Sequence, residues 1–229
     1  ADWPASIRER RRESVEQYRL HLDASEGVIH PVALCYQALS SLGEKDIMVI
    51  DGGDIACWFE TALSIWALEG KKIKAIINPG PWEQMGTGPA FATGVKMANP
   101  DSNVVLVTGD GSLGLAPGLT PLETSMDYNA PITIVVANNG QWGMIQEQQK
   151  AMWGRVVATS LRQLDYAPIF AGGGAHAETV HNAADITKAI HRSLTNNAKT
   201  SALVDVKTCS ARSPITQGLV DMRIKTAIG

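Results

Sequence analysis

Cysteine is scarce in this sequence. The three cysteines, Cys35, Cys57 and Cys209, lie far apart and form no CxxC pair. Their odd number and wide spacing argue against both a disulfide framework and a zinc site. We therefore expect a reducing, cytoplasmic setting.

Long apolar runs and an excess of charge are also lacking. No run of about 18 apolar residues occurs and no basic-then-apolar leader opens the chain, so we expect neither a membrane span nor a secretion signal. With 20 basic and 23 acidic side chains the net charge is −3, which argues against nucleic acid or anionic lipid as a partner. One locally basic stretch, Arg8 to Arg12, is interrupted by Glu9 and predicts a solvated or partner-facing helix that continues to about Arg19.

What the sequence does contain is a regular alternation of short, β-branched apolar runs with helix-length segments. This alternation predicts an α/β fold, with a doubly wound, mostly parallel sheet and helices on both faces. Runs such as Val104 to Val107 and Ile132 to Val136 are apolar almost throughout, which indicates strands buried on both sides. The expected strands are residues 46–51, 73–78, 103–108, 132–137, 176–180 and 202–207, and the expected helices are residues 31–42, 55–69, 86–98, 114–128, 142–152, 162–171 and 183–196.

No internal repeat or low-complexity linker divides the chain. We divide it into a helical lead-in at residues 1–28, a single domain at residues 29–208 and a tail at residues 209–229. The tail has no clear partner in the chain, so we expect it to be a lid or a subunit-contact arm.

Polar residues follow two successive strands of the predicted sheet. Gly109-Asp110-Gly111-Ser112 comes directly after the third strand, and Asn138-Asn139-Gly140 follows the fourth. The carboxyl ends of neighbouring parallel strands open into the same crevice, so Asp110 and Asn139 should meet there. A carboxylate and an amide oxygen suit magnesium or calcium, and phosphate oxygens would supply further ligands.

The glycines of this motif allow the backbone to approach a phosphate group. Gly111 and Ser112 open a helix whose positive end attracts anions, and Ser112 can donate its hydroxyl as well. Taken alone, Gly-Asp-Gly is weak evidence for a phosphate site, because ordinary strand-to-helix turns also contain it. The asparagine pair that begins 26 positions after Ser112 makes the pattern specific.

With this pattern the chain resembles the C-terminal, cofactor-diphosphate domain of the acetolactate synthase superfamily, which includes oxalyl-CoA decarboxylase and 2-hydroxyacyl-CoA lyases. The resemblance covers nearly the whole chain and implies the thiamine-diphosphate-binding fold, with thiamine diphosphate and Mg²⁺ as cofactors. It implies that the Asp110 and Asn139 side chains and the Gln141 main-chain carbonyl bind the metal, while Asn138 is structural. The implied cofactor-binding residues are Gly53, Asp54, Met85, Gly109, Gly111, Ser112, Asn139, Trp142, Gly143 and Met144.

Two further segments carry the resemblance. Asp51-Gly52-Gly53-Asp54 is most similar to the diphosphate-contacting stretch of 2-hydroxyacyl-CoA lyases. The Asp54 carboxylate should repel a diphosphate, so we expect backbone amides to act there, or Asp54 to accept a hydrogen bond elsewhere.

The second segment, Trp82 to Pro89, resembles the family's Gly-Thr-Met-Gly-x-Gly-x-Pro. By that resemblance Met85 is the apolar wedge that bends the cofactor into a V, with core packing as the alternative. The main-chain carbonyl of Glu83 would accept a hydrogen bond from the cofactor's 4'-amino group. Glutamate stands there in place of the usual glycine, which weakens this assignment.

The helix that follows the metal motif should line the substrate pocket, with Gln141, Ile145 and Gln148 as candidates. Pyruvate-decarboxylase-like members have a glutamate in place of Ile145, and acetolactate synthases have a tryptophan in place of Gln148. Both departures argue against those two activities. The resemblance therefore favours a lyase or decarboxylase acting on a 2-hydroxyacyl-CoA or 2-oxoacid substrate.

In the family a glutamate of a separate pyrimidine-binding domain activates the cofactor, and no glutamate of this chain has that context. We therefore expect a second polypeptide or a longer precursor to supply it, in a hetero-oligomer such as a heterotetramer. The alternatives are an acetolactate-synthase-like carboligase and a non-catalytic regulatory or binding subunit. A nicotinamide-binding protein is disfavoured, because the glycine fingerprint after the first strand is missing.

Two other features receive structural interpretations. His30 precedes Pro31 at an expected helix start, so a capping or packing role is favoured over catalysis. Gly172-Gly173-Gly174 lacks the spacing of a phosphate loop and is predicted to end a helix.

Overall fold

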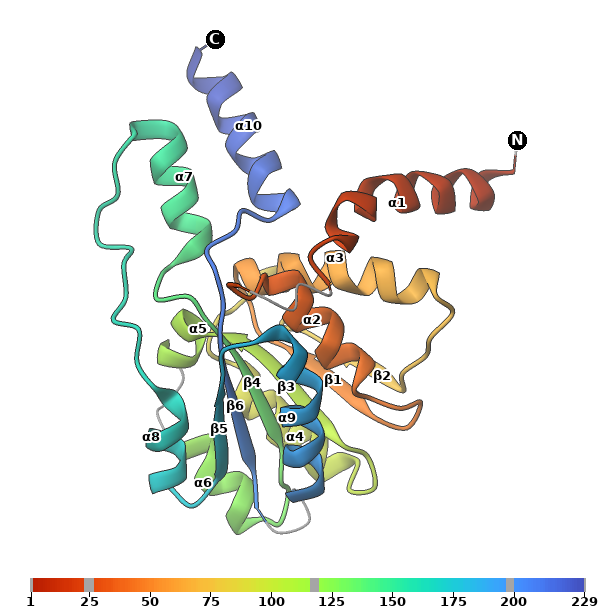
Figure 1. Cartoon of the computed structure of the whole chain (residues 1–229), viewed down its shortest axis with the longest axis vertical. Helices are drawn as coiled ribbons and strands as arrows, with labels where there is room; N and C mark the ends of the chain where they lie inside the picture. Colours follow the sequence, from red (N-terminus) through yellow and green to blue (C-terminus); the bar gives the residue numbers. More distant parts are fainter. Residues whose placement is uncertain (1, 23–26, 116–119, 197–199, 229) are drawn as a thin grey trace.

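The computed structural model describes residues 2–22, 27–115, 120–196 and 200–228 (Figure 1). Within these residues six parallel strands form one sheet, in the order β2-β1-β3-β4-β6-β5. The predicted α/β fold class is confirmed. The strands are β1 Ile47–Ile50, β2 Ala75–Ile77, β3 Val104–Gly109, β4 Thr133–Asn138, β5 His176–Val180 and β6 Ala202–Lys207, so each predicted strand is found within a few residues of its expected position.

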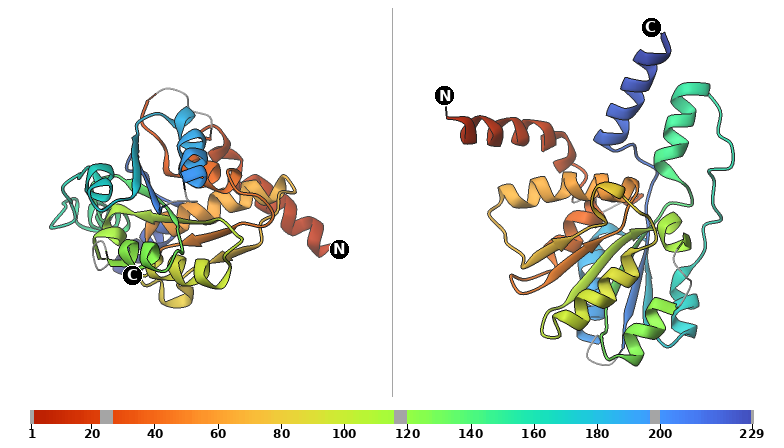
Figure 2. Two further views of the ribbon diagram at one scale, coloured as in Figure 1. Left: turned by 90° about the horizontal axis from the view of Figure 1, so that it is seen from below. Right: turned by 180° about the vertical axis from the view of Figure 1, so that it is seen from behind.

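Helices cover both faces of the sheet, as Figures 1 and 2 show. One face packs under α2, α3 and α9 through side chains such as Val105 and Val135, and the other packs under α4, α6 and α8 through Leu106 and Ile134. The described helices are α1 Trp3–Arg19, α2 Pro31–Ser40, α3 Asp54–Leu68, the 3-10 turn η1 Gly80–Trp82, α4 Gly88–Ala98, α5 Asp110–Leu115, α6 Thr120–Asp127, α7 Gly143–Trp153, α8 Tyr166–Gly172, α9 Ala183–Asn196 and α10 Pro214–Ile228.

The order of the strands fixes where a ligand can bind. The chain passes from β1 to β2 on one side of β1 and then returns to place β3 on the other side. In open α/β sheets such a reversal leaves a crevice at the carboxyl ends of the two strands. The loops after β1, β3 and β4 all open at this edge.

The helix expected at residues 114–128 differs from the structure. Helix α5 begins at Asp110, directly at the end of β3, and α6 covers Thr120–Asp127. Residues 116–119 of the expected helix lie outside the described residues. The early start puts Asp110 in the first turn of a helix, where the helix dipole favours a negative charge.

Both chain ends carry helices that extend from the sheet domain (Figures 1 and 2). Helix α1 begins at an Asp2 cap and buries Val15, while Arg8 to Arg12 are exposed, as a solvated helix requires. Residues 23–26 of the lead-in lie outside the described residues. The tail forms α10, which packs against α7 and α3; whether it acts as a lid or as a subunit arm stays a prediction.

Two smaller predictions are confirmed. The His30 side chain caps α2 by accepting a hydrogen bond from the Val32 N–H at 3.2 Å. The glycine run ends α8, with Gly173 as the C-cap. None of the described helices is long and apolar enough to span a membrane.

The centre of the sheet should dominate stability. Ile134 in β4 is 1% exposed, so Ile134→Ala should lower the free energy of unfolding by about 3 kcal/mol through lost burial and the cavity left behind. Ile169 in α8 is 44% exposed, and Ile169→Ala should cost less than about 1 kcal/mol. Urea denaturation of both variants measures the difference, and equal losses would contradict this description of the core.

Candidate functional site

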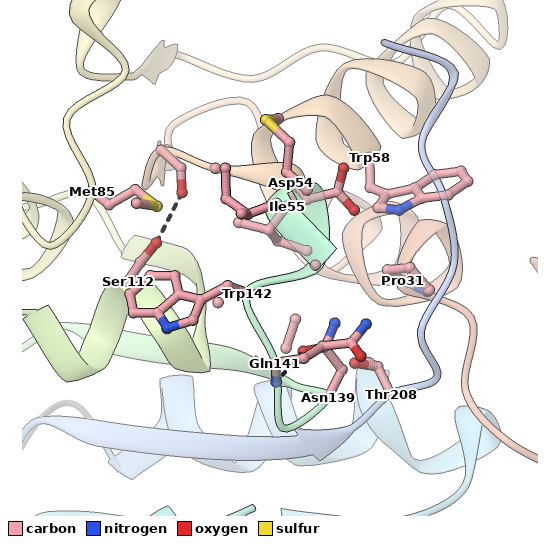
Figure 3. A pocket seen from close by; sticks show the side chains of 18 of the residues that line it. Pro31, Asp54, Ile55, Trp58, Met85, Ser112, Asn139, Gln141, Trp142 and Thr208 are labelled. Atoms are coloured by element: carbon pink, nitrogen blue, oxygen red, sulfur yellow. Dashed lines mark hydrogen bonds between the residues drawn. The ribbon is translucent and has the colours of Figure 1, made fainter. Parts of the chain in front are cut away.

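A cavity that is partly open to solvent lies at the carboxyl ends of the strands. One wall is formed by the loops after β1, β3 and β4 and contributes Gly53, Ser112 and Asn139 (Figure 3). Apolar side chains, Pro31 and Trp58 among them, also line the cavity. The cavity therefore sits at the strand reversal, where the fold places a ligand.

Asp110 joins the loops after β3 and β4. Its carboxylate is 3% exposed and accepts hydrogen bonds from the Gly111 N–H at 3.0 Å and the Gly140 N–H at 2.7 Å. Burial raises the pKa of Asp110 to about 6, and the charge of Asp205 acts in the same direction. A cation beside this carboxylate would remove the unfavourable charge.

The two asparagines of the pair have different surroundings. Asn138 is fully buried, and its Nδ2 donates to the Leu164 carbonyl at 2.8 Å and to Asp205 Oδ1 at 2.9 Å. Asn139 lines the cavity, and its Oδ1 accepts from the Gln141 N–H at 3.2 Å. Asn138 therefore holds the strand ends together, while Asn139 and Gln141 face the cavity with Asp110 on the neighbouring loop.

Glycines form a cradle that side chains would fill. Gly53 has φ +99°, and a Cβ there would lie 3.1 Å from Met85 Sδ and 3.7 Å from Ser112 Oγ. A Cβ on Gly111 would lie 2.8 Å from the Trp142 ring. Ser112 in turn donates its hydroxyl to the Gly52 carbonyl at 2.9 Å. The backbone is thus accessible from the cavity only because these positions carry no side chain.

The loop at residues 83–87, between η1 and α4, is called the Met85 loop and packs directly on the loop after β1. Met85 lines the cavity, and the main chain of Glu83 lies so close to Gly52 that a Cβ on Gly52 would be 2.3 Å from the Glu83 carbonyl oxygen. Glu83 itself has φ +47°, in the left-handed region that favours glycine. This backbone conformation explains why glycine suits that position better than glutamate does.

Sequence reasoning missed the role of Asp51. Its side chain is fully buried and accepts from the Gly52 N–H at 2.9 Å, the Gly86 N–H at 3.0 Å and the Thr108 hydroxyl at 3.0 Å. Burial raises the pKa of this carboxyl. Asp51 therefore fixes the Met85 loop to β1 and β3, and a lone acidic residue ending an apolar strand was the available signal.

Asp54 accepts hydrogen bonds from residues elsewhere in the chain, which was the second of the two expectations for it. Its Oδ1 accepts hydrogen bonds from the hydroxyls of Ser213, at 2.8 Å, and Thr216, at 2.7 Å. Burial raises the pKa of Asp54, and these hydroxyls oppose that shift. Residues far away in the sequence thus provide the hydrogen bonds to the Asp54 carboxylate at the cavity wall.

Helix α7 starts in the cavity and then leaves it. Trp142, Gly143, Met144 and Ile145 line the cavity, and Ile145 is 47% exposed. Gln148 is 7% exposed and is not among the described residues that line this cavity. Of the three substrate candidates, the structure therefore brings Gln141 and Ile145 to the site and leaves Gln148 in the packing of α7.

The segment that follows β6 also lines the cavity, through Thr208 and Ala211. Thr208, just after β6, lines the cavity, and its buried hydroxyl has no hydrogen-bond partner among the described residues. The side chain of Gln141 donates to the Ser210 hydroxyl. An unpartnered buried hydroxyl is costly unless a ligand atom satisfies it.

Comparison with known proteins bears on this geometry. The family described as thiamine pyrophosphate enzyme, C-terminal TPP binding domain, matches residues 51–206. The 2-hydroxyacyl-CoA lyase 2 of Danio rerio is 29% identical over 174 residues, which are 76% of this chain and 27% of that protein. The acetolactate synthase large subunit of Mycobacterium tuberculosis is 31% identical over 182 residues, which are 79% of this chain and 31% of that protein.

A solved structure shares the fold. The thiamine diphosphate-dependent 4-hydroxybenzoylformate decarboxylase of Rhodococcus jostii superposes with a TM-score of 0.67 at 22% identity, over 81% of this chain and 34% of that one. The chain thus spans about a third or less of the length of the proteins that it matches.

The residues present fit a magnesium diphosphate. Gly53 and Gly111 line the cavity without side chains, Thr208 has a buried hydroxyl with no partner among the described residues, and the donor set is one carboxylate with amide and carbonyl oxygens. Magnesium prefers such hard oxygen ligands, with phosphate oxygens and water completing its coordination. No cluster of three or more His, Cys, Asp or Glu side chains suited to a metal occurs in the described part of the chain, so a phosphate-bearing ligand would be needed to hold the ion.

Two glycines of α5 provide a matched test of the cradle. A Cβ on Gly111 would meet the Trp142 ring, whereas one on Gly114 would meet no atom of the described residues within 4 Å. Gly111→Ala should therefore weaken binding of thiamine diphosphate with Mg²⁺ about tenfold or more, as overpacking of about 1–3 kcal/mol implies. Gly114→Ala should leave binding unchanged and raise the free energy of unfolding by about 0.5 kcal/mol. Calorimetric titration measures binding, and equal affinities of the two variants would contradict the cradle.

Binding should depend on pH through Asp110. The cation requires the ionised carboxylate, and below the Asp110 pKa of about 6 the protonated form predominates. Affinity for Mg²⁺ with thiamine diphosphate should therefore be constant above that pKa and fall about tenfold per pH unit below it. Thiamine diphosphate also binds Mg²⁺ in solution, with an affinity that depends on pH. This affinity is measured in the same buffers and used to correct the binding data. A corrected affinity that does not change between pH 5 and pH 7.5 would rule out this role of Asp110.

Proposed function

The chain belongs to the thiamine pyrophosphate enzymes, whose C-terminal TPP-binding domain it matches, and we propose that it is the cofactor-binding subunit of a lyase or decarboxylase. The reaction cleaves or forms a C–C bond next to a carbonyl group. The substrate is of the 2-hydroxyacyl-CoA or 2-oxoacid type.

One observation carries the proposal, namely that Asn139 and Gln141 line the same cavity as Gly53 and Gly111. Asp110 and Asn139 follow neighbouring strands, and the Asp110 carboxylate bonds the Gly140 N–H, next to Asn139, at 2.7 Å. A side chain on Gly53 or Gly111 would crowd Met85 or Trp142, which also line the cavity. An oxyanion ligand and a hard cation are the chemistry that such a crevice recognises.

Each residue then has a binding role. Asp110, Asn139 and the Gln141 carbonyl would hold Mg²⁺, while the amides around Gly111 and the Ser112 hydroxyl would bind diphosphate oxygens. The Gly111 N–H would exchange its bond to Asp110, and the Ser112 hydroxyl its bond to the Gly52 carbonyl, for bonds to the ligand. The bound thiamine diphosphate supplies an electron sink for cleavage of the bond beside a carbonyl. Met85 would support the cofactor from the side opposite α7.

The Glu83 main-chain carbonyl would accept a hydrogen bond from the cofactor's amino group. Trp142 and Met144 would exclude water from the cofactor side of the cavity, since both line it.

The substrate class rests on the relatives and on the entrance of α7. Proteins named 2-hydroxyacyl-CoA lyase 2 and acetolactate synthase are similar to the chain at 26–31% identity. Ile145 presents an apolar, 47% exposed side chain at the cavity, which suits an acyl substrate better than a charged residue would. Similarity to acetolactate synthases supports a carboligase as the second candidate.

A second polypeptide is part of the proposal. The chain corresponds to 27–31% of the relatives named above, and the resemblance implies a pyrimidine-binding domain whose glutamate activates the cofactor. We propose that a partner chain supplies this domain in a cytoplasmic hetero-oligomer, such as a heterotetramer, with a longer precursor of this chain as the alternative source. A non-catalytic subunit of the same fold is the competing interpretation.

Native mass spectrometry with thiamine diphosphate and Mg²⁺ tests the proposal. We expect the chain to carry one cofactor together with a second polypeptide, and Asp110→Ala to lose the cofactor. Asp101 is exposed in the loop before β3, so Asp101→Ala is the matched control and should retain it.

Turnover of 2-hydroxyacyl-CoA compounds by the assembled complex then separates the candidates. Formation of a carboligated product would favour the acetolactate-synthase-like activity. Absence of any cofactor from the wild-type complex would overturn the enzyme assignment.

A further inference from the structure

Three helices begin around Asp54. Asp54 is itself the first residue of α3, and a Cβ on Gly143, the first residue of α7, would lie 3.7 Å from Asp54 Oδ2. Helix α10 begins at Pro214, next to Ser213, which binds Asp54. Helix N-termini favour negative charge, so this junction stabilises the carboxylate.

Two hydroxyl groups at the start of α10 bind the Asp54 carboxylate. Ser213 Oγ accepts the Thr216 N–H at 3.2 Å, as a capping serine does, and Pro214 occupies the first helical position. The hydroxyls of Ser213 and Thr216 both donate to Asp54 Oδ1, at 2.8 and 2.7 Å. Both hydroxyl residues are fully buried, so these bonds are shielded from water.

No basic side chain shares this task among the described residues. The nearby Arg212 pairs instead with Glu147, at 2.9 Å. The charge of Glu147 raises the pKa of Asp54, although less than burial does. Charge compensation at Asp54 therefore comes from hydroxyl groups, the Trp58 side chain and helix ends.

Asp54 also lines the cavity in which we propose that the diphosphate binds, next to Gly53. A carboxylate free to turn into the cavity would repel the diphosphate, whereas the two hydroxyl bonds hold Asp54 Oδ1 toward α10. The same segment brings Thr208 and Ala211 to the cavity wall.

We propose that Ser213 and Thr216 are positioning residues that hold the Asp54 carboxylate against α10, so that diphosphate binding and the docking of α10 depend on each other. This inference rests on the proposed cofactor site. Breaking the contact frees a negative charge beside the cradle, and binding the cofactor in turn favours the docked helix by the same free energy.

A double-mutant cycle tests the coupling. Ser213→Ala with Thr216→Val removes both hydroxyls, and thiamine diphosphate with Mg²⁺ is titrated calorimetrically into the full chain with whatever co-purifies. We expect affinity to fall about tenfold, the value of one charge-assisted hydrogen bond. In the D54N background the same two substitutions should change affinity less than about twofold, because no charge remains to be released.

Two controls separate positioning from loss of structure. Gln217→Ala alters α10 without touching Asp54, since Gln217 bonds only Arg212 and Asp221 among the described side chains, and it should bind normally. Thr216→Ser, made in the otherwise wild-type chain, keeps the hydroxyl and should bind the cofactor with most of the wild-type affinity. Hydrogen exchange of residues 209–222 should slow on cofactor binding in the wild type and remain fast in the doubly substituted protein.

The outcomes are distinct. Equal losses in the native and D54N backgrounds would show that the hydroxyls act without the Asp54 charge, and would overturn the positioning role of Ser213 and Thr216 while leaving the cofactor site intact. Undiminished binding by the doubly substituted protein would overturn it as well. Failure of the wild type to bind the cofactor would instead refute the proposed function.

Discussion

Asp51 ends β1 with a carboxylate that is fully buried and bound by two backbone N–H groups and the Thr108 hydroxyl. The geometry of the cavity depends on this interaction, because it joins the loop after β1, the Met85 loop and β3. Glycine-rich loops have little side-chain packing to hold them. A buried carboxylate can do so, since its two oxygens accept several hydrogen bonds at once.

Other buried carboxylates repeat this arrangement along the same edge of the sheet. Asp110 joins the loops after β3 and β4 through two backbone N–H groups, and Asp205 binds Asn138, the Tyr166 N–H and Lys207. Asp54 is satisfied by α10. Among these groups Asp110 has its pKa raised to about 6 mainly by burial, and in the described part of the chain it has no basic partner of the kind that Lys207 provides for Asp205. This difference is what supports the proposal of a cation at Asp110.

The sheet and the metal motif could be predicted well because their signals are local. Strands such as Val104–Gly109 and Thr133–Asn138 are apolar runs, and consecutive runs joined by helices form a parallel sheet whose carboxyl ends share an edge. That geometry alone placed Asp110 and Asn139 on adjacent loops. The helix expected at residues 114–128 was misplaced, because the helix after β3 starts at once with Asp110 and the glycines hid its beginning.

The sequence by itself determined the fold class, the order of its strands and helices, and the convergence of the Gly-Asp-Gly-Ser and Asn-Asn motifs. Only the tertiary structure decided what surrounds them. Asp54 is bound by residues 159 and 162 positions away, and Gln148 leaves the cavity although Ile145, three residues earlier, enters it. The physical reason is that hydrophobic periodicity specifies which face of an element is buried. It does not specify which distant hydroxyl or helix meets a buried charge, because that depends on how the assembled elements pack together.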